Sequence, residues 1–140
     1  MTTSTLEQMT SLLGKWEMSS LRYPEGRGTM TAEWLEGGAF LRLLDEVEQS
    51  MFPASTWIIG GDESSEDCQA LYHDSRGVSR VYQTSLKNDV WKIWRNAPGF
   101  NQRFTGTLID GGNTVAGQCE LSRDGSTWET DFDLTYRRVA

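Results

Sequence analysis

From Gly14 onward, apolar residues recur at about every second position, and clusters of turn-forming residues interrupt them at regular intervals. A period of two is typical of β-strands, and many short strands at regular spacing are typical of a sandwich or a barrel. Ten strands are expected, near residues 15–23, 28–36, 39–49, 54–60, 68–74, 78–86, 90–96, 100–109, 114–122 and 127–138. The one long connection expected between them is the acidic loop 61–67.

A different pattern precedes the first strand. A short helix is predicted over residues 5–13 from the helical spacing of Leu6, Met9, Leu12 and Leu13, with Thr3, Ser4 or Thr5 as N-cap and Gly14 as the stop. A chain of 140 residues, 37% of them hydrophobic, fits one core. Residues 1–140 are therefore expected to form a single domain.

The turns predict which side chains share a face of the sheet, because a turn fixes the register of the strands that it joins. The predicted pairs are Trp34 with Leu41 around Gly37-Gly38, Leu108 with Val115 around the turn 110–113, Ile93 with Gln102 and Trp91 with Phe104 around the turn 96–99, and Leu121 with Trp128 around Asp124-Gly125. The last of these places Trp128 and Thr130 on the inner face, with Glu129, Asp131 and Asp133 in solvent.

Two further turns orient the polar residues near the middle of the chain. A three-residue turn at Ser75-Arg76-Gly77 pairs Tyr72 with Arg80 and points His73 outward. A turn at Lys87-Asn88 pairs Arg80 with Arg95, and a turn at Asn88-Asp89 shifts the partners by two residues, with Arg80 inward in both cases.

These registers describe one continuous inner surface across successive antiparallel strands. Ten short strands are most simply closed into a barrel, because closure removes the unpaired edges. The predicted fold is therefore all-β, an antiparallel up-and-down barrel of ten strands with a short N-terminal helix.

The start of the first strand, Gly14-Lys15-Trp16 after a short helix, is similar to the Gly-x-Trp start of the calycin superfamily, which includes lipocalins and fatty-acid-binding proteins. Segments 28–38, 74–78, 98–106 and 128–136 resemble a group of uncharacterised bacterial calycin-like proteins. This resemblance implies a calycin-like barrel with no known activity. It also implies that a basic residue, Arg137 or Arg138, stacks on Trp16.

The net charge of −7 and the pI near 4.7 oppose nucleic acid or an anionic membrane as partner. Residues 1–14 lack the pattern of a secretory signal, and apolar runs are far shorter than the roughly 20 residues that span a bilayer. A cytoplasmic protein is expected. Cys68 and Cys119 match no metal or redox spacing, and two reduced thiols are expected.

The predicted inner face carries an unusual number of polar side chains among its aromatic ones. The candidate ligand-binding residues are Asp45, Tyr72, Asp74, Arg80, Tyr82, Trp91, Arg95, Gln102 and Phe104. One interpretation is that Asp45 and Asp74 neutralise Arg80 and Arg95, since a buried charge is costly unless it is paired. The other is that an arginine and a tyrosine hold an anionic group, as the resemblance to fatty-acid-binding proteins implies.

The leading hypothesis is a barrel that binds a small amphipathic, anionic molecule, with Arg95 facing the ligand because Trp91, Ile93, Phe100 and Phe104 surround it. The alternatives are an enzyme that uses the same polar set and a filled barrel with a structural or interaction role. No catalytic residue is assigned from the sequence.

No metal or other cofactor is expected. His73 is the one histidine in the sequence, and the ten-stranded haem-binding nitrobindins, which the predicted fold also resembles, use a histidine late in the chain, where Tyr136 stands here. Trp57 and Trp94 are expected at the rim or on the outer surface, and an exposed Trp94 would suit a homodimer interface.

Overall fold

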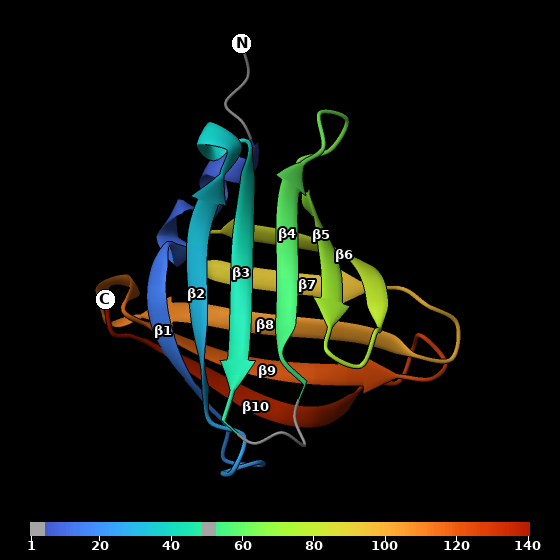
Figure 1. Ribbon diagram of the computed structural model, residues 1–140. Helices are drawn as coiled ribbons and strands as arrows, with labels where there is room; N and C mark the ends of the chain where they lie inside the picture. Colours follow the sequence, from blue (N-terminus) through green and yellow to red (C-terminus); the bar gives the residue numbers. More distant parts are fainter. Residues whose placement is uncertain (1–4, 49–52) are drawn as a thin grey trace.

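The computed structural model describes residues 5–48 and 53–140 (Figure 1). The elements are η1 (Thr5–Leu12), β1 (Gly14–Ser19), β2 (Gly28–Leu35), η2 (Glu36–Gly38), β3 (Phe40–Val47), β4 (Ser55–Gly61), β5 (Cys68–Asp74), β6 (Ser79–Lys87), β7 (Val90–Arg95), β8 (Asn101–Ile109), η3 (Asp110–Gly112), β9 (Thr114–Ser122) and β10 (Glu129–Arg138). The ten strands form a closed barrel in which each strand pairs antiparallel with its neighbours in the chain, and β1 pairs with β10. The predicted fold is confirmed.

The predicted helix is present as the 3₁₀-helix η1. Its apolar residues Leu6, Met9 and Leu12 stand three apart, which matches the three residues per turn of a 3₁₀-helix, and all three are buried. The helix packs against β3, β4 and β6 and covers one end of the barrel (Figure 1). The predicted N-cap residues Thr3 and Ser4 lie outside the described residues, as does Gln49 at the predicted end of the third strand. No helix in the described part of the chain is long and apolar enough to cross a membrane.

Several predicted registers are confirmed. Trp34 pairs with Leu41, Leu108 with Val115 and Tyr72 with Arg80. The β5–β6 turn ends at Gly77 with a φ of 84°, and His73 is exposed on the outer face. Of the two turns considered between β6 and β7, the structure has Asn88-Asp89, where both residues have positive φ, and Thr84 consequently pairs with Ile93.

Two predicted registers are wrong. Around the β7–β8 loop, Ile93 pairs with Phe104 rather than with Gln102, a shift of two residues that leaves every side chain on its predicted face. The β9–β10 connection is longer than a two-residue hairpin, because the Asp124 carboxylate accepts the N–H groups of Ser126 and Thr127 and holds a wider turn.

The wider turn changes the start of β10. Leu121 pairs with Glu129 rather than with Trp128, and the register shifts again at a β-bulge between Thr130 and Phe132. Thr130 therefore lies outside, where its hydroxyl accepts from Gln118. From Phe132 onward, the residues predicted to face inward do so. The two shifts of one residue together move the register by two, and side chains two positions apart on a strand share a face.

The first and last strands are joined by Arg138, which confirms the stacking expected from the resemblance. Its Cζ atom lies 4.1 Å from the centroid of the Trp16 ring. Trp16 is fully buried, and its indole Nε1 donates to the carbonyl of Leu12 at 2.9 Å. The same end of the barrel is filled by apolar side chains such as Met30, Leu41 and Ile59, each at most 1% exposed.

Candidate functional site

A cavity of about 220 Å³, partly open to solvent, lies among the inward-facing side chains of the barrel, and the ion-paired Arg103 and Glu120 also contribute to its lining. Gln8 of η1 accepts from the backbone N–H of Leu86 near the end of β6, whereas Arg80 and Tyr82 near the start of β6 line the cavity. The cavity therefore occupies the half of the barrel away from η1. Of the predicted site residues, Asp45, Tyr72, Arg80, Tyr82, Gln102 and Phe104 line it, whereas Asp74, Trp91 and Arg95 do not.

Arg80 is the cationic side chain on the inner face of β6. It is half-buried, lines the cavity, and its Cζ atom lies 5.5 Å from the centroid of the Phe100 ring. Among residues 5–48 and 53–140, its guanidinium group has no hydrogen-bond or ion-pair partner. A guanidinium group has five N–H donors, so Arg80 presents unused donors to the cavity.

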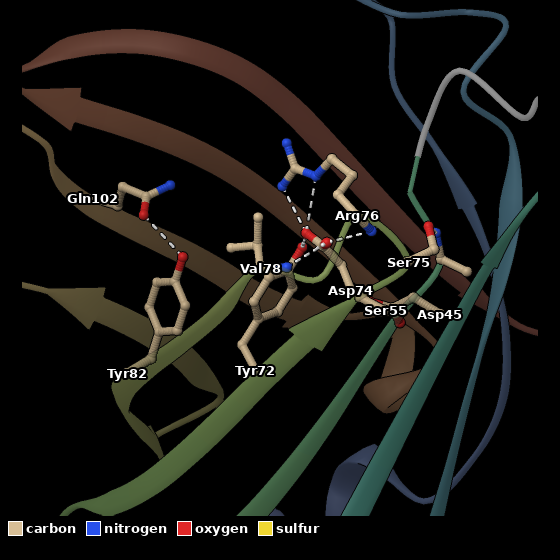
Figure 2. A network of polar contacts seen from close by, with 10 residues as sticks. Asp45, Ser55, Tyr72, Asp74, Ser75, Arg76, Val78, Tyr82 and Gln102 are labelled. Atoms are coloured by element: carbon tan, nitrogen blue, oxygen red, sulfur yellow. Dashed lines mark hydrogen bonds and ion pairs between the residues drawn. The ribbon is translucent and has the colours of Figure 1, made fainter.

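Asp74 is bound instead by its own turn (Figure 2). Its Oδ2 accepts from the Tyr72 hydroxyl at 2.6 Å and from Nη2 of Arg76 at 2.6 Å. Its Oδ1 accepts the backbone N–H groups of Arg76 and Val78. Hydrogen bonds from Arg76 hold the pKa of Asp74 well below its usual value. The interpretation in which Asp74 pairs with Arg80 or Arg95 is therefore wrong, because Arg76, in the same turn, occupies its carboxylate.

Asp45 makes no ion pair with any described residue. Its Oδ2 accepts from Ser55 Oγ at 3.1 Å and from Trp57 Nε1 at 3.2 Å. Its Oδ1 is buried and has no hydrogen-bond partner among the described residues. Burial disfavours the charged form and raises the pKa of Asp45 to about 6, although the bonds from Ser55 and Trp57 oppose this effect. The interpretation in which Asp45 neutralises an arginine is also wrong.

Aromatic rings form the wall between these polar groups. The Trp57 ring lies 4.7 Å from that of Tyr72 and 5.1 Å from that of Tyr82, centroid to centroid. The expectation that Trp57 lies at the rim or outside is wrong, because the β3–β4–β5 register aligns it with Leu43 and Tyr72 on the inner face. The internal hydrogen bond from Trp57 to Asp45 has no signature in the sequence.

The Tyr82 hydroxyl donates to Gln102 Oε1 at 2.8 Å, from β6 to β8 across the cavity wall (Figure 2). This bond engages the amide oxygen of Gln102. The amide nitrogen has no partner among the described residues and remains available as a donor. Gln102 and Arg80 thus supply N–H groups to the same cavity.

The other predicted site residues lie beside the cavity. Trp91 is 1% exposed, donates to Thr84 Oγ1 at 3.1 Å, and packs in the core against Phe104 with the ring centroids 5.2 Å apart. Arg95 pairs with Gln102 in the β7–β8 ladder but does not contact the cavity. Asp131, which was expected in solvent, lines the cavity at the bulge in β10.

Trp94 lies on the outer wall, as expected. It lines an open groove with Arg103 and Trp128. Arg103 forms an ion pair with Glu120 at 2.9 Å, and its Cζ atom lies 4.0 Å from the Trp128 ring centroid. Trp128, which was predicted to face inward, therefore packs on the outer surface.

The described residues contain no group of three or more His, Cys, Asp or Glu side chains that could hold a metal ion. A comparison with protein-family models found no match, and a search of curated proteins found none with significant similarity in sequence.

Proposed function

We propose that the barrel binds a compact, partly apolar anion in its cavity, with Arg80 as the charge partner. The observation that carries the proposal is the set of unused Arg80 donors in a cavity walled by aromatic rings. Charge-assisted hydrogen bonds to a carboxylate or phosphate are the strongest that such donors make. The free amide nitrogen of Gln102 adds a neutral donor beside it.

The size of the cavity favours a compact ligand over a long acyl chain. A cavity of roughly 150 Å³ accommodates benzene. The cavity in this barrel, at about 220 Å³, is larger than a benzene-sized cavity by about the volume of a short side chain. Small aromatic acids and acids of medium chain length are therefore better candidates than long-chain fatty acids.

The resemblance to bacterial calycin-like proteins belongs to the same proposal. The closed antiparallel barrel and the stacking of Arg138 on Trp16 support it. No disulfide bond joins Cys68 and Cys119, which supports the reducing environment of the cytoplasm as the proposed site of action.

The proposal is tested by Arg80→Met, with isothermal titration of 3-phenylpropionate, octanoate and hexadecanoate. The parent protein should bind at least one of the two short acids more tightly than hexadecanoate. Loss of a charge-assisted hydrogen bond of about 1.5 to 3 kcal/mol should weaken that binding roughly 10- to 150-fold in the variant. The variant should unfold near the temperature of the parent, because Arg80 forms no ion pair with residues 5–48 or 53–140.

Two matched variants control this experiment. Arg42→Met removes an arginine on the outer wall that pairs with Glu33. Arg95→Met removes the arginine that was predicted on the same face as Arg80 but does not line the cavity. Both should keep the affinity of the parent. Binding that depends on Arg95 rather than Arg80, or the absence of binding by every acid, would contradict the proposal.

A further inference from the structure

Asp45 lies in the cavity wall, and the described residues donate hydrogen bonds to only one of its two carboxylate oxygens. The residue is 8% exposed, and both of its internal hydrogen bonds reach the same oxygen, Oδ2. Oδ1 is buried, and the described part of the chain supplies no hydrogen-bond partner to it. Buried carboxylate oxygens without a partner are rare in native proteins, because the desolvation of the oxygen is then uncompensated. This orphaned acceptor is available to a hydrogen-bond donor from outside the described residues.

Tyr136 is a second polar group of the cavity whose hydroxyl has no partner among the described residues. It lines the cavity, is 5% exposed, and its hydroxyl makes no hydrogen bond with the described residues. Burial raises the pKa of Tyr136 well above its usual value, and the negative charge of Asp45 adds to this effect. The two side chains, from β3 and β10, line the same cavity.

We infer that Asp45 and Tyr136 form a second polar subsite, which binds a hydrogen-bond donor of the ligand. The inference rests on the proposed function and specifies its ligand class. The ligand is a compact acid that carries a hydroxyl or ammonium group separate from its anionic group. Arg80 holds the anionic group, and Asp45 accepts from the donor group.

The chemistry of the two groups selects a donor. An ionised carboxylate only accepts hydrogen bonds, so a second anionic or carbonyl group would be repelled by Asp45. The terminal torsion of an aspartate is broad, so a modest rotation presents Oδ1 to the cavity without moving the backbone. The Tyr136 hydroxyl both donates and accepts, and it can therefore donate to the oxygen of a ligand hydroxyl while Asp45 accepts the hydrogen bond that this hydroxyl donates.

The experiment uses three acids of nearly equal shape: 4-ethylbenzoate, 4-(hydroxymethyl)benzoate and 4-(aminomethyl)benzoate. A second series carries the same three para substituents on 3-phenylpropionate, which places them farther from the carboxylate. Isothermal titration of the parent protein should show at least one donor-bearing acid binding about tenfold or more tightly than its ethyl analogue. That preference should fall below about threefold in Asp45→Asn. Arg80→Met should weaken all members of a series and leave the preference unchanged.

The outcomes separate this inference from the proposed function. Equal binding of the three acids at both lengths, with dependence on Arg80, overturns the donor subsite and leaves the anion site intact. A donor preference that persists in both Asp45→Asn and Tyr136→Phe also overturns the subsite. Absence of Arg80-dependent binding overturns both. If Asp45→Asn does not fold, Tyr136→Phe decides, because its expected effect is the same loss of preference for the hydroxylated acid.

Discussion

The guanidinium group of Arg138 covers the indole ring of Trp16 and also donates to backbone carbonyl groups outside β10. Its partners are the carbonyl oxygens of Leu13, Ser11 and Gly112, the last two at 2.8 and 3.2 Å. One side chain therefore ties the last strand to the first strand, to η1 and to the β8–β9 turn. In an up-and-down barrel, the contact between the first and last strands is the one that closes the sheet.

Arg138→Met should lower the free energy of unfolding by about 2 to 4 kcal/mol, because it removes charge-assisted hydrogen bonds and a cation–π contact. Arg138→Lys should recover only part of this loss, since an ammonium group cannot reproduce the planar fork of donors. The control is Arg137→Met, which changes an exposed neighbour on the other face of β10 and should stay within about 0.5 kcal/mol of the parent. Urea denaturation measures all three; equal effects of the two methionine variants would contradict the closing role of Arg138.

Gly117→Ala should destabilise the barrel by overpacking. An added Cβ would lie 2.4 Å from Cε1 of Phe104 and 2.9 Å from the carbonyl oxygen of Leu134. Such insertions cost about 1 to 3 kcal/mol. Phe104→Leu removes the ring, so the cost of Gly117→Ala measured in that background should be smaller. Thermal or urea unfolding of the four proteins in this cycle gives the coupling, and additive effects would show that Phe104 does not limit the space at Gly117.

The faces of the strands could be predicted because a side chain's face depends only on the parity of its position. The predicted β7–β8 pairing differs from the observed one by two residues, yet Ile93 and Gln102 still face inward. Side-chain direction therefore survives an error in loop length, provided that the error is even. The bulge at Asp131 adds a single unpaired residue to β10, and the sequence shows no turn residue that marks it.

The partners of the polar residues could not be predicted in the same way. Asp74 faces the inside by parity, but its carboxylate is taken by Arg76, two residues along the same turn. The alternation of side chains along the strands assigns both Arg80 and Arg95 to the inner face. Only the three-dimensional closure of the barrel determines that Arg80 lines the cavity and Arg95 does not. The sequence therefore indicates which polar residues face the inside of the barrel. Which arginine among them is available to an anionic ligand depends on the packing of the folded protein.

Asp45→Asn should remove a pH dependence of stability that burial of Asp45 creates. The pKa of Asp45 is raised to about 6 from an ordinary value of 3.8, so the folded state binds the proton more tightly than the unfolded chain. The resulting stabilisation is present in full below about pH 4 and is lost as the pH rises through about 6, on the order of 3 kcal/mol in total. Asp124 and Asp133, whose pKa values are lowered, act in the opposite direction, but they do so equally in parent and variant. The measurement is therefore the difference in unfolding free energy between parent and Asp45→Asn from pH 4 to 7.5. That difference should shift in favour of the variant as the pH rises, and a constant difference would show that Asp45 titrates as an ordinary carboxyl group.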